Sequence, residues 1–256
     1  MYSGSFKSIR NYRKLHDPKT YAGEKGGANR DLIMNNAAFA RTRENMSEFG
    51  GCGAAVKVIR LGFLNLLPEQ ADAHFTGRLM RMTKEINRRD LEGEHGRRSI
   101  IFSAGRDKLR NMVFNTRVNL SEMMQGCFSC NHPESRLSGT LSVSDLKILS
   151  VYIPLGATYF RVQNHLSVIS DWVYSDLNHR YAALSPLNGM SAFAYSAYTP
   201  VYSTLSTDVL ASFPVDTVLT GDCTVMQCIG VEFFIRSAGD VFLPLKGGCM
   251  KVAEVF

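Results

Sequence analysis

Long apolar runs are missing from the sequence. No stretch reaches the roughly 18 consecutive apolar residues that a membrane-spanning helix needs. The basic start of the chain, MYSGSFKSIRNYRK, is not followed by the apolar segment of a secretory signal. We therefore expect a cytoplasmic protein that has no membrane partner.

Enzyme motifs are missing as well. Neither G-x-S-x-G nor H-E-x-x-H occurs. The segment 23–27, GEKGG, lacks the spacing of a phosphate-binding P-loop, and no apolar strand precedes it. We predict no catalytic residues, no cofactor and no enzymatic activity, and we interpret Lys25 with its glycines as a loop that can lie close to another chain.

Cysteines are few, and without a secretory signal the six of them indicate free thiols rather than a disulfide framework. Cys127, Cys130 and His132 could supply three zinc ligands, but no second ligand pair accompanies them. Cys223 and Cys228 are five residues apart, which places them on opposite faces of a strand. We predict ordinary loop and core cysteines and no metal site.

The composition that remains is that of a globular protein, 45% hydrophobic and 20% charged. The net charge of +6 is unevenly distributed. Residues 1–110 hold 21 Lys/Arg against 12 Asp/Glu, a charge of +9, whereas residues 111–256 hold 8 against 11, a charge of −3. This asymmetry suits either contact with nucleic acid or head-to-tail contact between copies of the chain.

Residues 1–36 mix basic residues with Gly, Asn and Tyr and follow neither a helical nor a strand period. We predict an extended basic arm. A segment of this kind is either mobile or ordered against a neighbouring surface.

Residues 37–137 are predicted to be mainly helical. Apolar side chains recur every three or four residues from Phe49 to Leu66 and from Phe75 to Ile86, and Pro68 separates the two runs. We expect two helices packed as an antiparallel hairpin. The segment 106–126 fits helix and strand equally well. The predicted basic surface consists of Arg78, Arg81, Lys84, Arg88 and Arg89.

Residues 138–256 change to a period of two. Apolar and polar residues alternate from Phe160 to Val168, which predicts a half-buried strand. The runs 225–235 and 241–245, separated by a turn, predict a hairpin. The predicted fold class is α+β: a basic arm and helical hairpin followed by a C-terminal antiparallel β-sandwich of jelly-roll or immunoglobulin-like type.

Residues 174–202 are rich in aromatic side chains and poor in charge. Tyrosines in such surroundings suit an interface, with another copy or, less favoured, with stacked bases. Phe193 and Tyr195 would share one face of a strand, and we expect Phe193 to be buried and the tyrosines to be exposed. The tyrosines assigned to a subunit interface are Tyr195, Tyr198 and Tyr202.

The string EKGG (24–27) is followed by NAAFARTREN (36–45) and SEFG (47–50). Together they resemble a family of uncharacterised bacterial proteins whose shared pattern reads roughly REKGG, a short gap, DPAFxRTRENxxEFG and a basic amphipathic helix. The likeness covers about residues 20–100, and this chain has Asn-Ala in place of Asp-Pro before Phe39. The resemblance implies no activity and transfers no catalytic residue.

The motif is dense in hydrogen-bond donors and acceptors. Arg41 lies within helical reach of Glu44, and Glu44 within reach of Glu48. Two interpretations stay open. One is a solvated, capped helix start. The other is a subunit interface that includes Glu44 and Glu48, in which Arg41 and Arg43 dock on carboxylates of a neighbouring subunit, with Phe39 and Phe49 as apolar anchors.

These observations favour a structural protein that assembles with itself into a homo-oligomer, tube or filament, the arm and hairpin of one copy contacting the sandwich of another. The charge asymmetry motivates this hypothesis. The alternative is a nucleic-acid-associated, coat-like protein. A third hypothesis, a ligand- or carbohydrate-binding sandwich module, rests on fold analogy alone.

Overall fold

The computed structural model describes residues 5–6, 9–13, 17, 19–24, 27–63 and 67–256. The chain divides into two compact units, Met1–Asn45 and Met46–Phe256. We call them the N-terminal unit and the body. Lys25, which the sequence assigns to an interface, lies outside the described residues.

Short strands and helices make up the described part of the N-terminal unit. They are β1 (Ser5–Phe6), β2 (Ile9–Arg13), β3 (Thr20–Glu24), α1 (Arg30–Asn35) and the 3-10 helix η1 (Ala37–Phe39). The sequence predicts an extended basic arm without regular periodicity here. The structure differs because strands of two to five residues are too short to display a period. Cross-strand pairing holds them, and the rings of Tyr12 and Tyr21 stack 5.9 Å apart.

The N-terminal unit has no core of its own among its described side chains. No residue of 9–12, 17, 19–24 or 27–45 is buried. Ile9, Leu32 and Met34 are 46%, 44% and 48% exposed. The N-terminal unit therefore exposes apolar side chains although it adopts regular secondary structure.

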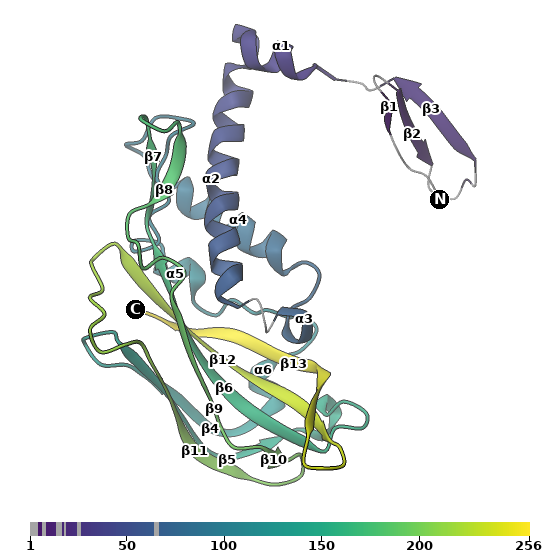
Figure 1. The fold of residues 1–256 in the computed structure, drawn as a ribbon, viewed down its shortest axis with the longest axis vertical. Coiled ribbons are helices and arrows are strands. Elements are labelled where there is room, and N and C mark those ends of the chain that lie inside the picture. The colour runs from purple at the N-terminus through teal and green to yellow at the C-terminus, as the bar shows by residue number, and fades with distance from the viewer. Residues whose placement is uncertain (1–4, 7–8, 14–16, 18, 25–26, 64–66) are drawn as a thin grey trace. The chain divides into compact units, whose positions relative to one another are not determined.

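The helices that follow are α2 (Ala40–Gly62), α3 (Leu67–Gln70), α4 (Phe75–Asn87), α5 (Arg106–Leu109) and α6 (Leu120–Met123). The two long helices, α2 and α4, form the expected helical hairpin region (Figure 1). Phe49 is expected on the buried face of α2, but its side chain is 58% exposed. Glu48 takes the buried position instead, and one residue further along a helix turns the side chain by about 100°.

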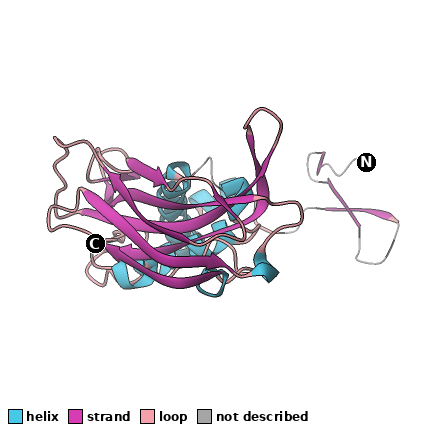
Figure 2. Ribbon diagram, turned by 90° about the horizontal axis from the view of Figure 1, so that it is seen from below, coloured by secondary structure: helices cyan, strands magenta, loops and turns pink. Residues whose placement is uncertain are grey.

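Antiparallel strands dominate the rest of the body (Figure 2). One sheet has the order β10-β6-β12-β13, with β9 also pairing to β6; a second has the order β11-β5-β4, and β7-β8 is a separate hairpin. The strands are β4 (Met124–Asn131), β5 (Ser138–Ile148), β6 (Tyr159–Ser170), β7 (Trp172–Ser175), β8 (Arg180–Ala183), β9 (Ser191–Tyr195), β10 (Thr199–Pro200), β11 (Leu205–Ser212), β12 (Cys223–Arg236) and β13 (Phe242–Val255). The segment 106–126 thus resolves into α5, a connecting loop, α6 and the start of β4.

The two larger sheets face each other across an apolar interior. Leu141 and Val143 of β5 pack with Val162 of β6 and Val231 of β12 in one buried cluster. The expected antiparallel sandwich is confirmed. Its first strand along the chain is β4, which precedes the predicted boundary at residue 138.

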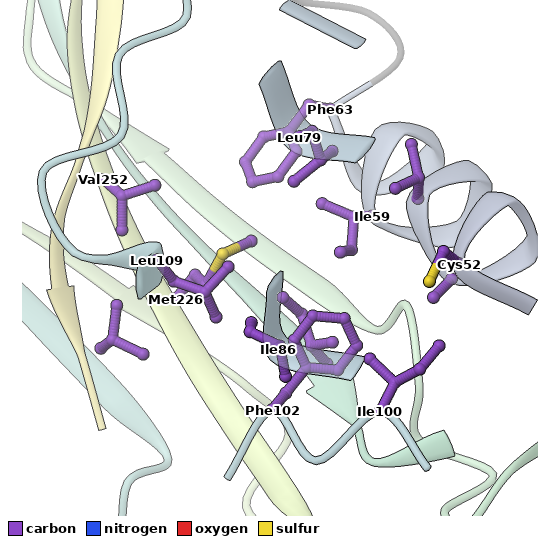
Figure 3. Packing of buried hydrophobic residues seen from close by; sticks show 14 of the residues in the cluster. Cys52, Ile59, Phe63, Leu79, Ile86, Ile100, Phe102, Leu109, Met226 and Val252 are labelled. Carbon is purple, nitrogen blue, oxygen red and sulfur yellow. The ribbon is translucent and has the colours of Figure 1, made fainter. Parts of the chain in front are cut away.

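A second buried cluster joins the helices to the sheet (Figure 3). Cys52, Ile59 and Leu79 of the hairpin pack with Met226 of β12 and Val252 of β13. The helices therefore cover the outer face of the β6–β12–β13 sheet. Apolar side chains on both faces of β12 follow from this arrangement.

Strand β6 corrects the expectation of a half-buried strand. Gln163, His165 and Ser167, the polar side of its alternation, are all at most 3% exposed. The hairpin covers them: the ring of Phe63 lies 4.6 Å from that of His165, and Gln163 donates to Gln70 at 2.5 Å. The alternation alone indicates a solvent-facing polar row, because the residues that cover it lie about 100 positions earlier in the chain.

Candidate interaction surfaces

One face of the main sheet continues past the hairpin and carries a cluster of aromatic and arginine side chains. Antiparallel pairing aligns them, since Tyr195 lies opposite Gln163, Arg161 opposite Glu232, and Arg236 opposite Phe242. We call this cluster the aromatic face. Its members are Tyr159, Arg161, Phe193, Tyr195, Tyr198, Phe234, Arg236 and Phe242.

Arg161 lies at the centre of the aromatic face. Its guanidinium carbon is 3.7 Å from the ring centroid of Tyr195 and 5.0 Å from that of Phe234. Its Nε donates to Glu232 Oε2 at 2.6 Å. Cation–π contacts and a charge-assisted hydrogen bond together hold a side chain that would otherwise be mobile.

Stacked rings extend the aromatic face toward the β12–β13 hairpin. Tyr198 stacks on Phe242 with ring centroids 3.8 Å apart and meets Phe234 edge-on at 4.9 Å. Arg236 donates to Asp240 and to the hydroxyl of Tyr159. The rings are thus pre-positioned by one another.

The aromatic face is electrically balanced and partly open to solvent, with Phe234 buried among its other side chains. Arg161 is paired with Glu232, and Arg236 with Asp240. Phe193 is 60% exposed and Tyr198 37% exposed. The expected burial of Phe193 is wrong, because Phe193 points out of the sheet on the outer side, away from the sandwich interior, and contacts the rings of His165 and Tyr195 there.

Two other tyrosine expectations have different outcomes. Tyr202 is 86% exposed in the turn after β10, as expected. Tyr181 is only 8% exposed. It lies against Gly51 of α2, and its hydroxyl donates to the carbonyl of Arg98 at 2.9 Å.

The arginine motif is largely engaged within the chain. Arg41 donates to Glu44 at 2.7 Å. Arg43 donates to the carbonyls of Ile33 and Asn36 at 2.7 and 2.8 Å, which ties α1 to the start of α2. The anchor Phe39 is half-buried.

Glu48 is the motif residue with the most demanding environment. It is 1% exposed and accepts hydrogen bonds from Arg98, from Lys84 and from the backbone N–H of Gly96. Burial raises the pKa of its carboxyl, but the hydrogen bonds outweigh burial and hold the pKa at about 2. Glu48 is a buried anion that joins α2, α4 and the following loop.

Most of the predicted basic surface is ion-paired. The pairs are Arg78–Asp72 at 2.8 Å, Lys84–Glu48, Arg89–Asp107 at 2.6 Å and the long Arg81–Glu85 contact at 3.9 Å. Within the described residues no ion pair of Arg88 is found. The carboxylates paired with Lys84 and Arg89 lie 36 and 18 residues away, so the charge pattern along the chain does not reveal those two pairs.

A groove of about 610 Å³ runs between the first half of α2 and the β7–β8 hairpin. Its lining is Met46, Ser47, Gly50, Gly51, Ala54, Trp172, His179, Arg180, Tyr181, Ala182 and Ala183. A Cβ built on Gly51 would lie 2.4 Å from the ring of Tyr181. A Cβ on Gly50 would meet no atom within 4 Å. Gly51 is thus required by packing within the body, and Gly50 is not.

The thiol and imidazole string on β4 is spread out. Cys127 is exposed, Cys130 is half-buried, and the ring of His132 stacks on Phe256 at 3.8 Å. Among the residues that the structure describes, no group of three or more His, Cys, Asp or Glu side chains is arranged to hold a metal ion. In the same part of the chain, no helix combines the length and apolar character needed to cross a membrane.

The sequence singles out Tyr195 and Tyr198 as interface candidates, and their role at an interface stays a prediction. It gives no such indication for Arg161, Phe234 and Phe242, which the structure places beside them. Those three belong to strands up to 81 residues apart, and each alone looks like an ordinary strand residue. The period of two did place Arg161 on the side opposite Val162. That was the one available signal.

Comparisons of the chain with family models, with curated proteins and with solved structures found no match. The resemblance to an uncharacterised bacterial family over about residues 20–100 therefore stays a prediction from the sequence motif.

Proposed function

We propose that this protein is a structural subunit that assembles with further copies of itself, and that the aromatic face is one of the contact surfaces. The observation that carries the proposal is a charge-balanced cluster of rings around Arg161, in which Phe193 and Tyr198 are exposed. Tyr, Phe and Arg are the residue types enriched in the central parts of protein interfaces.

The rigidity of the aromatic face supports this role. Its side chains are held by stacking and ion pairs, and all but Tyr198 lie on regular strands, so little rotamer freedom is lost on binding. Its arginines have carboxylate partners within the chain, which disfavours a polyanion as the partner. An apolar protein surface fits better.

The N-terminal unit supports the same proposal. It displays apolar side chains and contains no buried residue in its described part. It also carries nine Lys/Arg against four Asp/Glu, a net charge of +5. Two distinct contact surfaces on one subunit generate a ring if the rotation closes, and a tube or filament if it does not.

Sedimentation velocity and negative-stain microscopy of nuclease-treated protein test the proposal. We expect the wild-type protein to form ordered particles. The protein concentration needed for half-assembly should rise at least about tenfold in the double variant Phe193→Ser/Tyr195→Ser. Leu91→Ser, at a residue 91% exposed in a polar loop, is the matched control and should assemble normally. A full-length chain that stays monomeric at all concentrations would contradict the proposal.

A carbohydrate-binding module remains the second candidate, because stacked, uncharged ring surfaces also suit uncharged ligands. The same double variant discriminates. A monomeric wild type whose thermal midpoint rises with one neutral glycan, and does not rise for the double variant, would favour this candidate.

A further inference from the structure

The groove along α2 contains one feature that packing within the body does not explain. Gly50 lies in the interior of a 23-residue helix, where glycine is unfavourable by about 1 kcal/mol relative to alanine. Nothing in the body occupies the space in front of it. By contrast, the ring of Tyr181 fills the space at Gly51, and a Cβ built on Gly62 would lie 3.0 Å from the hydroxyl oxygen of Ser167.

Glycine on an open groove wall suits a neighbour that comes close to the helix backbone. The groove around it is mostly apolar, with Met46, Ala54, Trp172 and Ala183 in its walls. Its occupant must therefore bring apolar side chains from outside the body.

We infer that this groove receives the N-terminal unit of a second copy of the chain, with α1 of that copy lying against Gly50. The inference rests on the proposed self-assembly and names its second contact. Leu32 and Met34 of α1 are 44% and 48% exposed, and no described residue of their unit is buried. In the first turn of α1, Asp31 is opposite in charge to Arg180 in the groove wall, whereas its neighbour Arg30 has the same charge as Arg180, so the match depends on Asp31 alone.

Trp172 makes the occupancy of the groove directly measurable. It is the single tryptophan of the chain, it is 7% exposed, and it lines the groove. Its emission therefore reports on this surface and not on the aromatic face. We expect the emission of the full-length protein to shift with concentration over the range in which particles form.

Two variants should each abolish that shift. Gly50→Leu fills the groove from its own wall, and Leu32→Ser with Met34→Ser removes the apolar side chains of α1. Gly77→Ala is the control, since a Cβ at this exposed helical position also meets no atom within 4 Å but lies outside the groove. It should keep the shift.

Mixing the two defective variants gives the decisive result. The Leu32→Ser/Met34→Ser copy retains an open groove, and the Gly50→Leu copy retains an intact N-terminal unit. We expect the emission shift to return in the mixture for about half of the tryptophans, because the Gly50→Leu copy can only donate and the other can only accept.

Folding is checked with Gly50→Ala, which should raise the thermal midpoint by roughly 2–4 °C while raising the concentration for half-assembly several-fold. A lower midpoint would mean that Gly50 is needed within the body and would overturn the inference. Two results would overturn the groove contact and leave the proposed function standing. One is particles that form while Trp172 emission stays constant, and the other is a mixture of the two variants that shows no emission shift. A chain that remains monomeric with constant emission would overturn both.

Discussion

Glu48 lies where α2, α4 and the loop after α4 meet. Its carboxylate compensates two cations, Lys84 and Arg98, whose side chains are only 17% and 14% exposed. Removing one partner of a buried ion pair leaves the remaining charge buried without compensation. The free-energy cost of that uncompensated charge is larger than the net stabilisation that the pair contributes.

We therefore predict that Glu48→Gln lowers the free energy of unfolding by about 3 kcal/mol. Glu44→Gln, which removes an exposed i,i+3 pair with Arg41, should cost less than about 0.5 kcal/mol. Urea unfolding of both variants measures this. Equal effects would show that the network around Glu48 is not a structural centre.

His165 provides a prediction about pH. Burial lowers the pKa of its ring to about 4, and the nearby Gly62 backbone offsets this only in part. No ring nitrogen of His165 has a hydrogen-bond partner of good geometry among the described residues. The unfolded chain, with a pKa near 6.5, therefore binds more protons than the folded chain between pH 6.5 and 4.

Stability should consequently fall as the pH drops through this window, by up to about 1.4 kcal/mol per pH unit from His165 alone. His165→Leu should reduce the slope of unfolding free energy between pH 6.5 and 5. Below about pH 4.5 both proteins should weaken further as Glu48 becomes protonated in the unfolded state. Identical slopes above pH 5 would contradict a buried, neutral His165.

At the scale of elements, α2 makes different contacts at successive residues. Gly51 admits the ring of Tyr181 from the β7–β8 hairpin, while Gly50 faces open groove. The two adjacent glycines therefore differ: packing within the body requires a glycine at position 51 but not at position 50.

We predict that Gly51→Ala lowers the free energy of unfolding by about 2 kcal/mol through overpacking against Tyr181. It should also change Trp172 emission, because Trp172 belongs to the same hairpin. Thermal unfolding of Gly51→Ala beside Gly50→Ala measures the contrast. Two changes of the same sign would contradict this description of the helix.

At the scale of the whole molecule, the uneven charge of the chain allowed a nucleic-acid partner. Ion pairs neutralise most of the predicted basic surface, and among the described residues only Arg88 of its five cations has no ion pair. We predict that a filter-binding assay at low salt retains neither DNA nor RNA. Retention that falls steeply with salt would instead favour the coat-like alternative.

Repeating patterns let the sequence by itself determine the fold class. A three-to-four-residue period predicts α2 and α4, and a period of two predicts strands such as β5, whose exposure alternates as expected. The period depends only on neighbouring residues. It therefore survives without knowledge of what each element packs against, provided that the element is long enough to repeat, which β1 and β2 are not.

Only the tertiary structure decided which faces are covered and which charges are free. The polar side of β6 is buried because the hairpin lies over it, and the rings around Arg161 converge because four strands distant in sequence are paired in register. Burial and ion pairing depend on the partner that a residue meets in space. No local pattern carries that information, so the aromatic face and the groove at Gly50 became visible only in the folded chain.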